Sequence, residues 1–521
     1  MRDIRVAAGA DRTVRRSGRR GRWRPRTAPD EKGDTLFFLA RQVPHQTCSW
    51  GAGIAMMMFG PCYGPRIGEL HMNMRTNRRR FLGTTAAAAA WATAHGHTKG
   101  AEKTVGPNET VRLGLIGCGG EGRAVMHGHL LCPGVRAVAV CDVHADRLAQ
   151  TRAEFGGEKV AAFSDYRKLL SDGDVDAVIV ATNDHWHALA TIDACKAGKH
   201  VYVEKPLATS IGEGAAVVKA ARQTGCVVQI GTQQHSWPHY QEAVQLIQAG
   251  RLGEISEVKA WDYDYLYPGF GNPPDGPHPK ELDWEFWVGP SPKVPYNPNR
   301  YTNHYWWFDY AGAWQLDWGV HHYDIVHWAL GVKSPATATA SGDFLCFEKT
   351  NVEWPDTFSG ICQYGPGPVA KKGFLLQYSF RGGCRREQVS HAKCFFGTEA
   401  SMLLHRGGFE IRAEARGGKQ LGEVIESKSN VFQDNVHVQS IRAHAQVFLD
   451  AIRSGGKVPA DAECGHYASM PGHLLNIAWR VGRKITWDVE NERVVNDPEA
   501  DKLVAKMYRD PWKLDAQRKG E

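Results

Sequence analysis

The stretch VRLGLIGCGGEG, residues Val111 to Gly122, decides how the chain folds. It begins as a short apolar run typical of a β-strand and passes into the pattern Gly117-x-Gly119-x-x-Gly122, where a helix is expected to start. Glycine at these places permits a tight turn, close approach of the backbone to a pyrophosphate, and close contact between strand and helix. The stretch therefore predicts a dinucleotide-binding loop, with a plain turn as the alternative.

Four further apolar runs follow before Thr232, separated by stretches with helical spacing. They are VRAVAVCD, VDAVIVAT, KHVYVEKP and CVVQIGT. This alternation predicts parallel strands joined by helical crossovers. Their nearly continuous Val, Ile and Leu content indicates a sheet that helices cover on both faces. We therefore expect a Rossmann domain over residues 105–232.

The second of these runs ends in Asp142, which follows the glycine pattern at the spacing of a ribose-binding carboxylate. Such a carboxylate accepts both ribose hydroxyls and repels a 2′-phosphate, so it favours NAD. Arg147 weakens that preference and keeps NADP as an alternative, and Asp142 could instead cap a helix. Further ligand contacts are expected beyond the carboxyl ends of the later strands. The predicted cofactor-binding residues are Gly117, Cys118, Gly119, Gly120, Glu121, Gly122, Asp142, Arg147, Thr182, Asn183, His187, Glu204 and Lys205.

Longer alternating runs after Gly231 predict a second domain of a different kind. EISEVKAWDYDY, TFSGICQY and GFLLQYSF indicate strands, and CFFGTEASMLL indicates a hairpin with Gly397 in its turn. We expect an α+β domain with a largely antiparallel open sheet over residues 233–435, one outer face of which would supply an oligomer interface. HAQVFLDAIRSG and HLLNIAWRVGRK predict C-terminal helices, over residues 436–521, that fold back on the first domain.

The motif EKP at residues 204–206, placed after this glycine pattern, resembles the glucose-fructose oxidoreductase / inositol dehydrogenase (Gfo/Idh/MocA) family. The likeness continues through TNDHWHALATIDACKAGKHVYVEKPLA and WFDYAGAWQLDWGVHHYDIVHWALG to HYASMPGHLLNIAWRVGRKITWD. Asn183 stands where the family commonly has proline, which affects only the shape of one loop. The resemblance implies an NAD(P)-dependent oxidoreductase that forms a dimer or tetramer.

The resemblance also implies a catalytic centre made of Lys205, Asp317 and His321. Oxidation of an alcohol requires a base within hydrogen-bond reach of the hydroxyl proton. We expect His321 to be that base, Lys205 to polarise the oxygen and position the cofactor, and Asp317 to orient the imidazole or bind a neighbouring hydroxyl. On one helix, Asp317, His321 and Asp324 would share a face. Alternatively, Asp317 and His321 form a structural pair, which is the role expected of His322 and Asp324.

The Pro-, Gly- and aromatic-rich stretch from Tyr263 to Tyr310 is expected to have little regular structure. Long irregular loops inside compact enzymes are usually functional, and Trp and Tyr rings can stack on the apolar face of a pyranose. We therefore expect this stretch to bind substrate, with ordinary aromatic packing as an equal alternative.

Residues 74–94, MRTNRRRFLGTTAAAAAWATA, resemble a twin-arginine export signal with Arg78 and Arg79 at its start and an Ala-x-Ala end. We expect residues 74–104 to be signal and linker, and residues 1–73 to be a disordered or spurious leader. The mature protein would then be periplasmic or otherwise exported. Without a functional signal it would be cytoplasmic.

The net charge of +7 is concentrated in this front segment, because the chain after Ala94 holds 46 Lys and Arg against 50 Asp and Glu. Such a body argues against nucleic-acid binding, which depends on clustered basic residues. The twelve cysteines include no CxxC pair and no Cys/His cluster at zinc spacing, so the sequence predicts no metal site. The apolar run at residues 51–60 is too short for stable membrane insertion.

These observations predict an oxidoreductase that transfers hydride between NAD(H) and a hydroxyl or keto group of a sugar or polyol. Export favours an alternative, because a periplasm supplies no steady pool of NAD. The alternative is a redox-neutral, NAD-dependent glycoside-cleaving or epimerising enzyme with a transient keto-sugar. A non-catalytic binding protein is the least favoured, since Lys205, Asp317 and His321 are all present.

Overall fold

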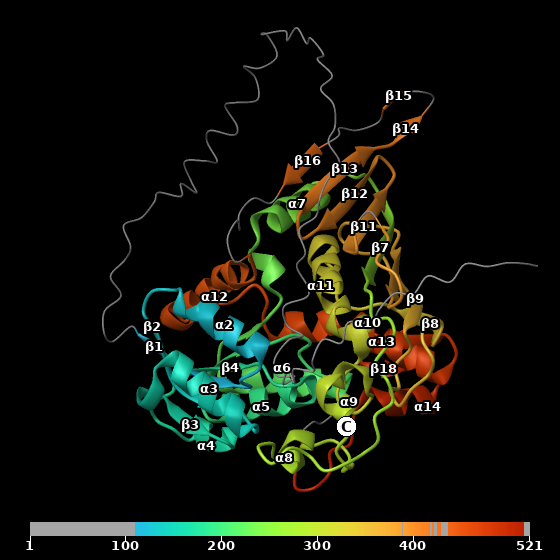
Figure 1. Cartoon of the computed structure of the whole chain (residues 1–521). Helices are drawn as coiled ribbons and strands as arrows, with labels where there is room; N and C mark the ends of the chain where they lie inside the picture. Colours follow the sequence, from blue (N-terminus) through green and yellow to red (C-terminus); the bar gives the residue numbers. More distant parts are fainter. Residues whose placement is uncertain (1–109, 388, 417–418, 421–424, 429–435, 515–521) are drawn as a thin grey trace, which may run out of the picture. The chain divides into compact units, whose positions relative to one another are not determined.

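The computed structural model describes residues 110–387, 389–416, 419–420, 425–428 and 436–514. The expected leader, signal and linker lie outside these residues. The described chain forms a six-stranded sheet, a ten-stranded sheet, a small two-stranded ribbon and the helices that pack on the larger sheets (Figure 1). None of the described helices is both long enough and apolar enough to cross a membrane.

The six-stranded sheet is wholly parallel, with the order β3-β2-β1-β4-β5-β6 of a Rossmann fold. Its strands are β1 (Val111–Ile116), β2 (Val135–Cys141), β3 (Ala161–Phe163), β4 (Ala177–Val180), β5 (His200–Val203) and β6 (Val228–Ile230). The predicted fold of this domain is confirmed. Only β3 was missing from the sequence prediction, because three residues with a single large apolar side chain do not form a recognisable run.

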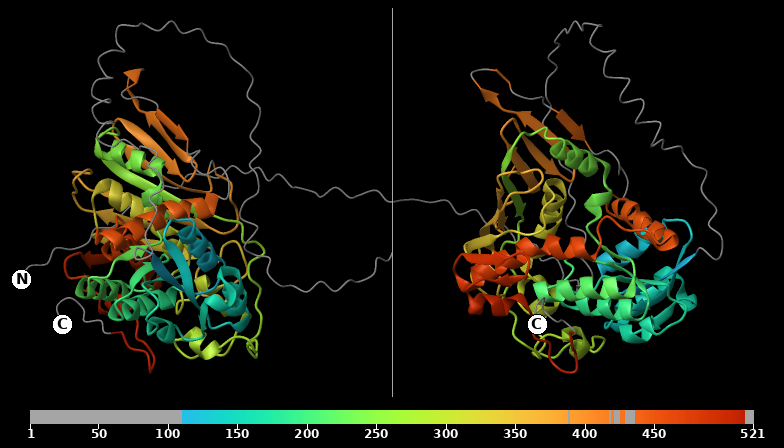
Figure 2. Two further views of the ribbon diagram at one scale, coloured as in Figure 1. Left: turned by 90° about the vertical axis from the view of Figure 1, so that its left-hand side faces the viewer. Right: turned by 180° about the vertical axis from the view of Figure 1, so that it is seen from behind.

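Helices cover both faces of this sheet (Figure 2). Leu113 and Leu115 of β1 point to the face where Met126 and Phe448 pack, whereas Ile116 points to the other. The first face holds α2 (Gly120–Leu130) and α12 (Val436–Ser454); the second holds α5 (Asp184–Lys196) and α6 (Ile211–Thr224). The C-terminal α12 thus completes the Rossmann core.

The ten-stranded sheet is antiparallel except for the pair β7 and β10, in the order β16-β13-β12-β11-β7-β10-β9-β8-β17-β18. Its strands are β7 (Ile255–Tyr263), β8 (Thr337–Asp343), β9 (Thr357–Tyr364), β10 (Phe374–Arg381), β11 (His391–Gly397), β12 (Ala400–His405), β13 (Gly408–Ala413), β16 (Ile425–Lys428), β17 (Ile485–Asp488) and β18 (Arg493–Val494). The ribbon consists of β14 (Ala415–Arg416) and β15 (Lys419–Gln420). The largely antiparallel second sheet is therefore confirmed, including the β11–β12 hairpin.

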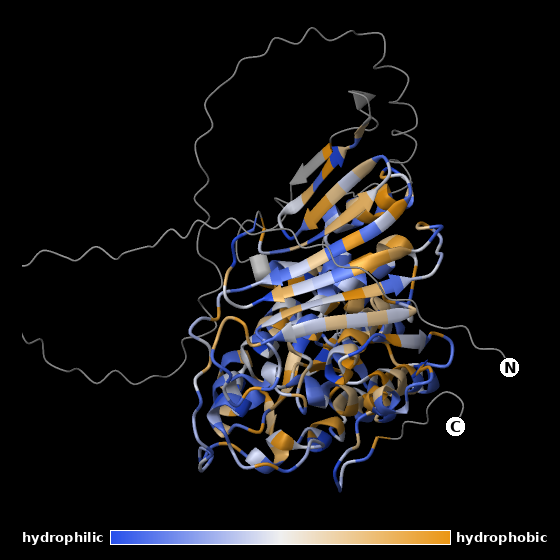
Figure 3. Cartoon of the chain, turned by 90° about the vertical axis from the view of Figure 1, so that its right-hand side faces the viewer, coloured by the Kyte–Doolittle hydropathy of each residue, from blue (hydrophilic) through white to orange (hydrophobic). Residues whose placement is uncertain are grey.

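One face of this sheet packs on helices, and buried residues alternate with more exposed ones along β9 and β10. Figure 3 shows hydrophilic and hydrophobic residues interspersed along the strands. The inner face contacts α7 (Pro238–Gln248), α11 (Gly319–Leu330) and α13 (Ala462–Val481). On the outer face, Ile361 and Leu375 are 41% and 43% exposed. The inner face therefore supplies the core of the second domain.

The stretch between β7 and α11 has more regular structure than expected. It contains α8 (Trp284–Val288), α9 (Pro298–Thr302), the 3₁₀ turn η4 (His304–Trp306) and α10 (Ala313–Asp317). The remaining short elements are α3 (Ala145–Phe155), η2 (Gly157–Lys159), α4 (Tyr166–Leu170), η3 (Gln233–Ser236), α14 (Pro498–Asp501) and η5 (Lys502–Val504). The expectation that Asp317 and His321 lie on one helix was wrong, because α10 ends at Asp317 and α11 begins at Gly319.

Candidate active site

The glycine loop between β1 and α2 has the geometry that a dinucleotide requires. Gly117 has a φ of +99°, and a Cβ there would lie 2.4 Å from the carbonyl oxygen of Ala181. A Cβ on Gly122 would lie 2.0 Å from the carbonyl oxygen of Gly117, so only glycine allows the helix to approach the turn. A Cβ on Gly119 would meet nothing within 4 Å, although Gly119 lines a cavity. That open side fits close approach of a pyrophosphate.

Asp142 follows β2 at the edge of this loop. Its carboxylate accepts hydrogen bonds from the backbone N–H groups of Cys118, at 2.7 Å, and His144, at 2.8 Å. Burial raises its pKa, against the effect of these two hydrogen bonds. The backbone therefore fixes the carboxylate against the glycine loop, where it can accept ribose hydroxyls and would repel a 2′-phosphate.

A cavity of about 220 Å³ runs along the loop and the carboxyl ends of the neighbouring strands. Its wall includes Gly117, Gly119, Gly120, Glu121, Gly122, Asp142, Arg147, Thr182 and Asn183 from the predicted cofactor set. From the second domain it includes Phe286, Trp287, Tyr301, His304 and Tyr305. We call this cavity the cofactor groove.

Backbone hydrogen bonds join the second domain to the segment that follows Asp142 at the edge of the cofactor groove. The backbone N–H of Ala145 donates to the carbonyl of Glu281 at 2.8 Å, and that of Asp283 donates to Val143 at 3.0 Å. The Arg147 guanidinium lies 5.2 Å from the centre of the Tyr301 ring. Residues from both domains therefore surround the Asp142 carboxylate, which is the group expected to bind ribose.

Lys205 follows β5 and forms an ion pair with Asp317 at the end of α10. Its Nζ lies 2.9 Å from Asp317 Oδ1 and 3.2 Å from the Asp317 carbonyl oxygen. Burial lowers the pKa of Lys205, but the charges of Asp317 and Glu204 outweigh it, so the pKa is raised overall. Lys205 is therefore a protonated donor held by the second domain.

Buried carboxyl groups surround this lysine. Burial, together with the charge of Glu121, raises the pKa of Glu204 to about 8. Burial, together with the charge of Asp317, raises the pKa of Asp184 well above its usual value. Sequence analysis did not select Asp184, although it directly follows Asn183 in the same motif. The charge of Lys205 partly offsets these increases, because it lowers the pKa of Glu204, Asp184 and Asp317.

His321, on the first turn of α11, is 4% exposed. Burial and the charges of Arg406 and Lys205 lower its pKa well below the usual value, so the imidazole is neutral. Within the described chain, its Nδ1 has no hydrogen-bond partner. Its ring centre lies 6.2 Å from that of Trp318, which is in turn 6.0 Å from Lys205 Nζ. His321 is therefore a neutral imidazole near Lys205, and its Nδ1 has no hydrogen-bond partner among the described residues.

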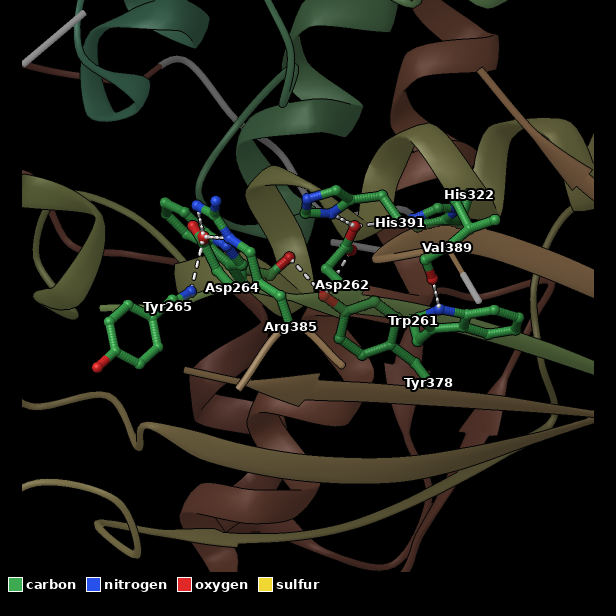
Figure 4. A network of polar contacts seen from close by, with 10 residues as sticks. Trp261, Asp262, Asp264, Tyr265, His322, Tyr378, Arg385, Val389 and His391 are labelled. Atoms are coloured by element: carbon green, nitrogen blue, oxygen red, sulfur yellow. Dashed lines mark hydrogen bonds and ion pairs between the residues drawn. The ribbon is translucent and has the colours of Figure 1, made fainter. Parts of the chain in front are cut away.

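The next residue, His322, points into a buried network centred on Asp262 of β7 (Figure 4). Asp262 is fully buried and lies 3.0 Å from His322 Nε2, 2.9 Å from His391 Nδ1 and 2.8 Å from the Tyr378 hydroxyl that donates to it. Burial would raise the pKa of Asp262, but its histidine partners hold it far below the usual range. This network attaches α11 to the large sheet. No motif in the sequence connects these residues.

Asp324 also turns away from Lys205. Its Oδ1 lies 2.9 Å from His235 Nε2 and accepts a hydrogen bond from Cys464 Sγ at 3.3 Å. His235 in turn stacks on Trp328, with ring centres 4.4 Å apart. Asp324 thus links α11 to η3 and to the start of α13.

Besides Lys205, three predicted cofactor residues are absent from the lining of the cofactor groove. His187 is 1% exposed, and its ring nitrogens lie 2.7 Å from the Pro206 carbonyl oxygen and 3.0 Å from that of Thr182. Burial lowers its pKa to about 4. Cys118 acts through its backbone N–H, and Glu204 lies against Gly231. We therefore assign His187 to joining the loops after β4 and β5.

The aromatic stretch packs in the core of the second domain and also lines the cofactor groove, and its predicted contact with substrate stays a prediction. All four of its tryptophans and one tyrosine are buried in the core of the second domain. These are Trp284, Trp287, Trp306, Trp307 and Tyr310. Tyr301 and Tyr305 line the cofactor groove with His304, whose Nε2 lies 4.0 Å from Asp184 Oδ1. The stretch therefore forms a wall of the cofactor groove in addition to its packing role.

Comparisons with known proteins agree with this geometry. The chain is similar to a glycosyl hydrolase family 109 protein from Saccharopolyspora erythraea, with 36% identity over 28% of this chain and 37% of the relative. It is also similar to the scyllo-inositol 2-dehydrogenase (NAD(+)) of Bacillus subtilis, with 28% identity over 39% of this chain and 48% of the relative. The matched regions thus span less than half the length of these relatives.

Among solved structures, levoglucosan dehydrogenase in complex with NADH and levoglucosan shares the fold. The TM-score is 0.56 at 17% identity, covering 72% of this chain and 99% of that chain. Residues 111–232 match the oxidoreductase family with an NAD-binding Rossmann fold. Residues 242–342 and 422–514 match the C-terminal alpha/beta domain of the same family. With a cofactor groove in the first domain and a lysine, aspartate and histidine where the second meets it, the chain belongs to the Gfo/Idh/MocA family of oxidoreductases.

Proposed function

We propose that the protein transfers hydride between NAD(H) and a secondary hydroxyl or keto group of a sugar or polyol. The observation that carries this proposal is the contact between Lys205 Nζ and Asp317 Oδ1, which joins the end of β5 to the second domain beside the cofactor groove. The named activities of the inositol and levoglucosan dehydrogenases support the same substrate class.

In this proposal Lys205 acts as a donor to the reacting oxygen. Its raised pKa keeps it protonated at neutral pH, and Asp317 fixes the position of its Nζ. A protonated donor stabilises the negative charge that develops on the oxygen during oxidation. Bound NAD supplies the hydride acceptor.

His321 is the proposed acceptor of the hydroxyl proton. A neutral imidazole with a free nitrogen can take a proton, and the Nδ1 of His321 has no partner within the described residues. The same low pKa limits its strength as a base, so a substrate hydroxyl already polarised by Lys205 is the proton donor that suits it. Lys205 and His321 therefore act on one oxygen.

Replacement of Lys205 tests this proposal. Lys205→Met should lower the turnover of any accepted sugar by about a thousand-fold, while the bound NAD is retained, because the lysine lies outside the groove wall. The measurement is cofactor reduction under saturating sugar, with the NAD content of each variant determined after denaturation. Lys168→Met, an exposed lysine on α4, is the matched control. Unchanged turnover in Lys205→Met would overturn the proposal.

A second function is a redox-neutral cleavage of glycosides, which the similarity to a glycosyl hydrolase family 109 protein favours. Transient oxidation of a hydroxyl acidifies the neighbouring C–H and permits elimination. An aryl α-N-acetylgalactosaminide, incubated with the protein in heavy water, distinguishes the two. Release of a sugar that carries solvent deuterium on carbon would support this second function. Absence of release, or release without deuterium, would exclude it for this glycoside.

We further propose that the protein is exported and forms a homo-oligomer. The twin-arginine-like sequence at residues 74–94 supports export. The open outer face of the large sheet, with Ile361 and Leu375 exposed, supports self-association through that face. Fractionation of cells that produce the full chain and light scattering of the purified protein test the two proposals.

A further inference from the structure

The indole of Trp318 is a common neighbour of the groups in the candidate active site. Its ring centre lies 6.0 Å from Lys205 Nζ and 6.2 Å from the ring centre of His321. A third group, the Arg406 guanidinium, lies with its Cζ 5.1 Å from the same ring centre. Arg406 comes from the turn between β12 and β13, so the large sheet places a second cation beside the proposed reaction centre.

The Arg406 guanidinium lacks an anionic partner within the described residues. It is partly buried and lies over the ring of Trp318, and among the described residues it forms no ion pair and no hydrogen bond. Other arginines of the same sheet are paired, as Arg385 is with Asp264 and Arg412 is with Glu410. A guanidinium presents five donors in a fixed plane, so Arg406 keeps unused donors next to the site.

Lys393 of β11 makes the surroundings of His321 still more positive. This lysine is fully buried, and its Nζ lies 3.3 Å from Gln234 Oε1 and 4.8 Å from the centre of the Tyr240 ring. Burial lowers its pKa to about 7. A buried cation without a carboxylate partner is costly. Arg406 and Lys393 both lie close enough to His321 for their charges to lower its pKa.

We propose that the substrate is a sugar acid whose carboxylate binds Arg406 while one of its hydroxyls lies between Lys205 and His321. This inference rests on the proposed function and specifies its substrate class. A carboxylate matches the planar guanidinium in charge and can accept two parallel hydrogen bonds. Trp318, whose ring stacks on His391 with ring centres 5.0 Å apart, is the common neighbour of the two contact points. A uronic acid supplies both the carboxylate and the hydroxyl.

Binding of matched sugars to the NAD-loaded protein tests this inference without requiring turnover. Isothermal titration with glucuronate and galacturonate is compared with titration of glucose and galactose, which differ only in carrying a CH₂OH group in place of the carboxylate. The uronates should bind at least about tenfold more tightly, since a charge-assisted pair is added. The preference should shrink as salt is raised.

Variants of Arg406 assign the preference to this residue. Arg406→Met should abolish the difference between uronate and hexose and leave hexose binding unchanged, whereas Arg406→Lys should retain part of it. Arg136→Met is the matched control, because Arg136 is an exposed residue of β2. Denaturant unfolding of each variant confirms that it is folded; if Arg406→Met is not, the comparison rests on Arg406→Lys and Arg406→Gln.

The outcomes separate this inference from the proposed function. Equal binding of uronates and hexoses, no binding of either, or tighter binding of glucose 6-phosphate than of glucuronate would overturn the assignment of a carboxylate. A preference that persists in Arg406→Met would overturn the role of Arg406. Tight uronate binding without hydride transfer would support the inference and contradict the proposed function.

Discussion

The cofactor half and the reaction half of the site are built from different parts of the polypeptide. Around the cofactor groove, the decisive groups are backbone atoms and missing side chains, as at Gly117, Gly119 and Gly122. Around Lys205 and Asp317, the decisive groups are ionisable side chains that meet from distant segments. The cofactor half therefore depends on local chain geometry, whereas the reaction half depends on how buried charges are balanced across the domain.

Substitution of Gly119 should have the greatest effect, and it distinguishes loss of NAD binding from loss of stability in the cofactor half. Gly119→Val should weaken NAD binding by more than about a thousand-fold, or about 4 kcal/mol, because its side chain would occupy the groove. It should leave the unfolding of the cofactor-free protein unchanged, since a Cβ there meets no protein atom within 4 Å. Calorimetric titration with NAD and denaturant unfolding measure the two quantities.

Gly173→Val is the matched control for this substitution. A Cβ on Gly173 also meets nothing within 4 Å, and Gly173 lies outside the lining of the cofactor groove. It should therefore change neither quantity. Normal NAD binding by Gly119→Val would show that the glycine loop does not contact the cofactor.

The second effect concerns the charge balance of the reaction half. Asp262→Asn removes the buried charge that pairs with His322 and His391, and should lower the free energy of unfolding by about 3 kcal/mol. Denaturant unfolding measures the loss. Asp174→Asn, at a carboxylate with a 78% exposed side chain, should change stability by less than about 0.5 kcal/mol. Equal effects of the two substitutions would refute the idea that buried charge holds α11.

A smaller effect is expected at His129, a buried histidine outside the site, on the pH dependence of the free energy of unfolding. Burial among Tyr202 and Phe448 lowers the pKa of His129 to about 4. The unfolded chain binds this proton near pH 6.5, so the stability that neutral His129 provides is complete above pH 6.5 and is lost as pH falls towards 4. Between pH 7 and pH 5, wild type should lose about 2 kcal/mol more than His129→Leu.

Unfolding curves at the two pH values give this difference directly. Any constant cost of the His129→Leu substitution cancels when the pH-dependent losses are compared. His278→Leu removes an exposed histidine and should leave the pH dependence as in wild type. Parallel losses in wild type and His129→Leu would contradict the prediction.

The Rossmann half could be predicted from the sequence because its determinants lie within short segments. The glycine pattern, the carboxylate after the second strand and the apolar runs each span a few residues, and the parallel sheet follows from their alternation. The place of His187 near a strand end did not reveal that backbone carbonyls lie within hydrogen-bond distance of both of its ring nitrogens.

The reaction half was predictable only in part. The resemblance supplied Lys205 and Asp317, which the structure brings within 2.9 Å. The break at Trp318 between α10 and α11 was missed, because the residues on both sides have helical spacing. Asp262 and Arg406 could not be selected, since each is one charged residue in an alternating strand or turn. Their neighbours are fixed only when the large sheet forms.

Transfer of deuterium from a sugar to the bound cofactor would demonstrate hydride transfer at this site. The NAD-loaded protein is mixed with a uronate deuterated at its ring carbons, and the cofactor is released by denaturation and weighed by mass spectrometry. Wild type should carry deuterium on the nicotinamide and Lys205→Met should carry none, although both retain the cofactor. Unlabelled cofactor in wild type, or equal labelling in both proteins, would contradict the claim that Lys205 and its partners direct hydride transfer.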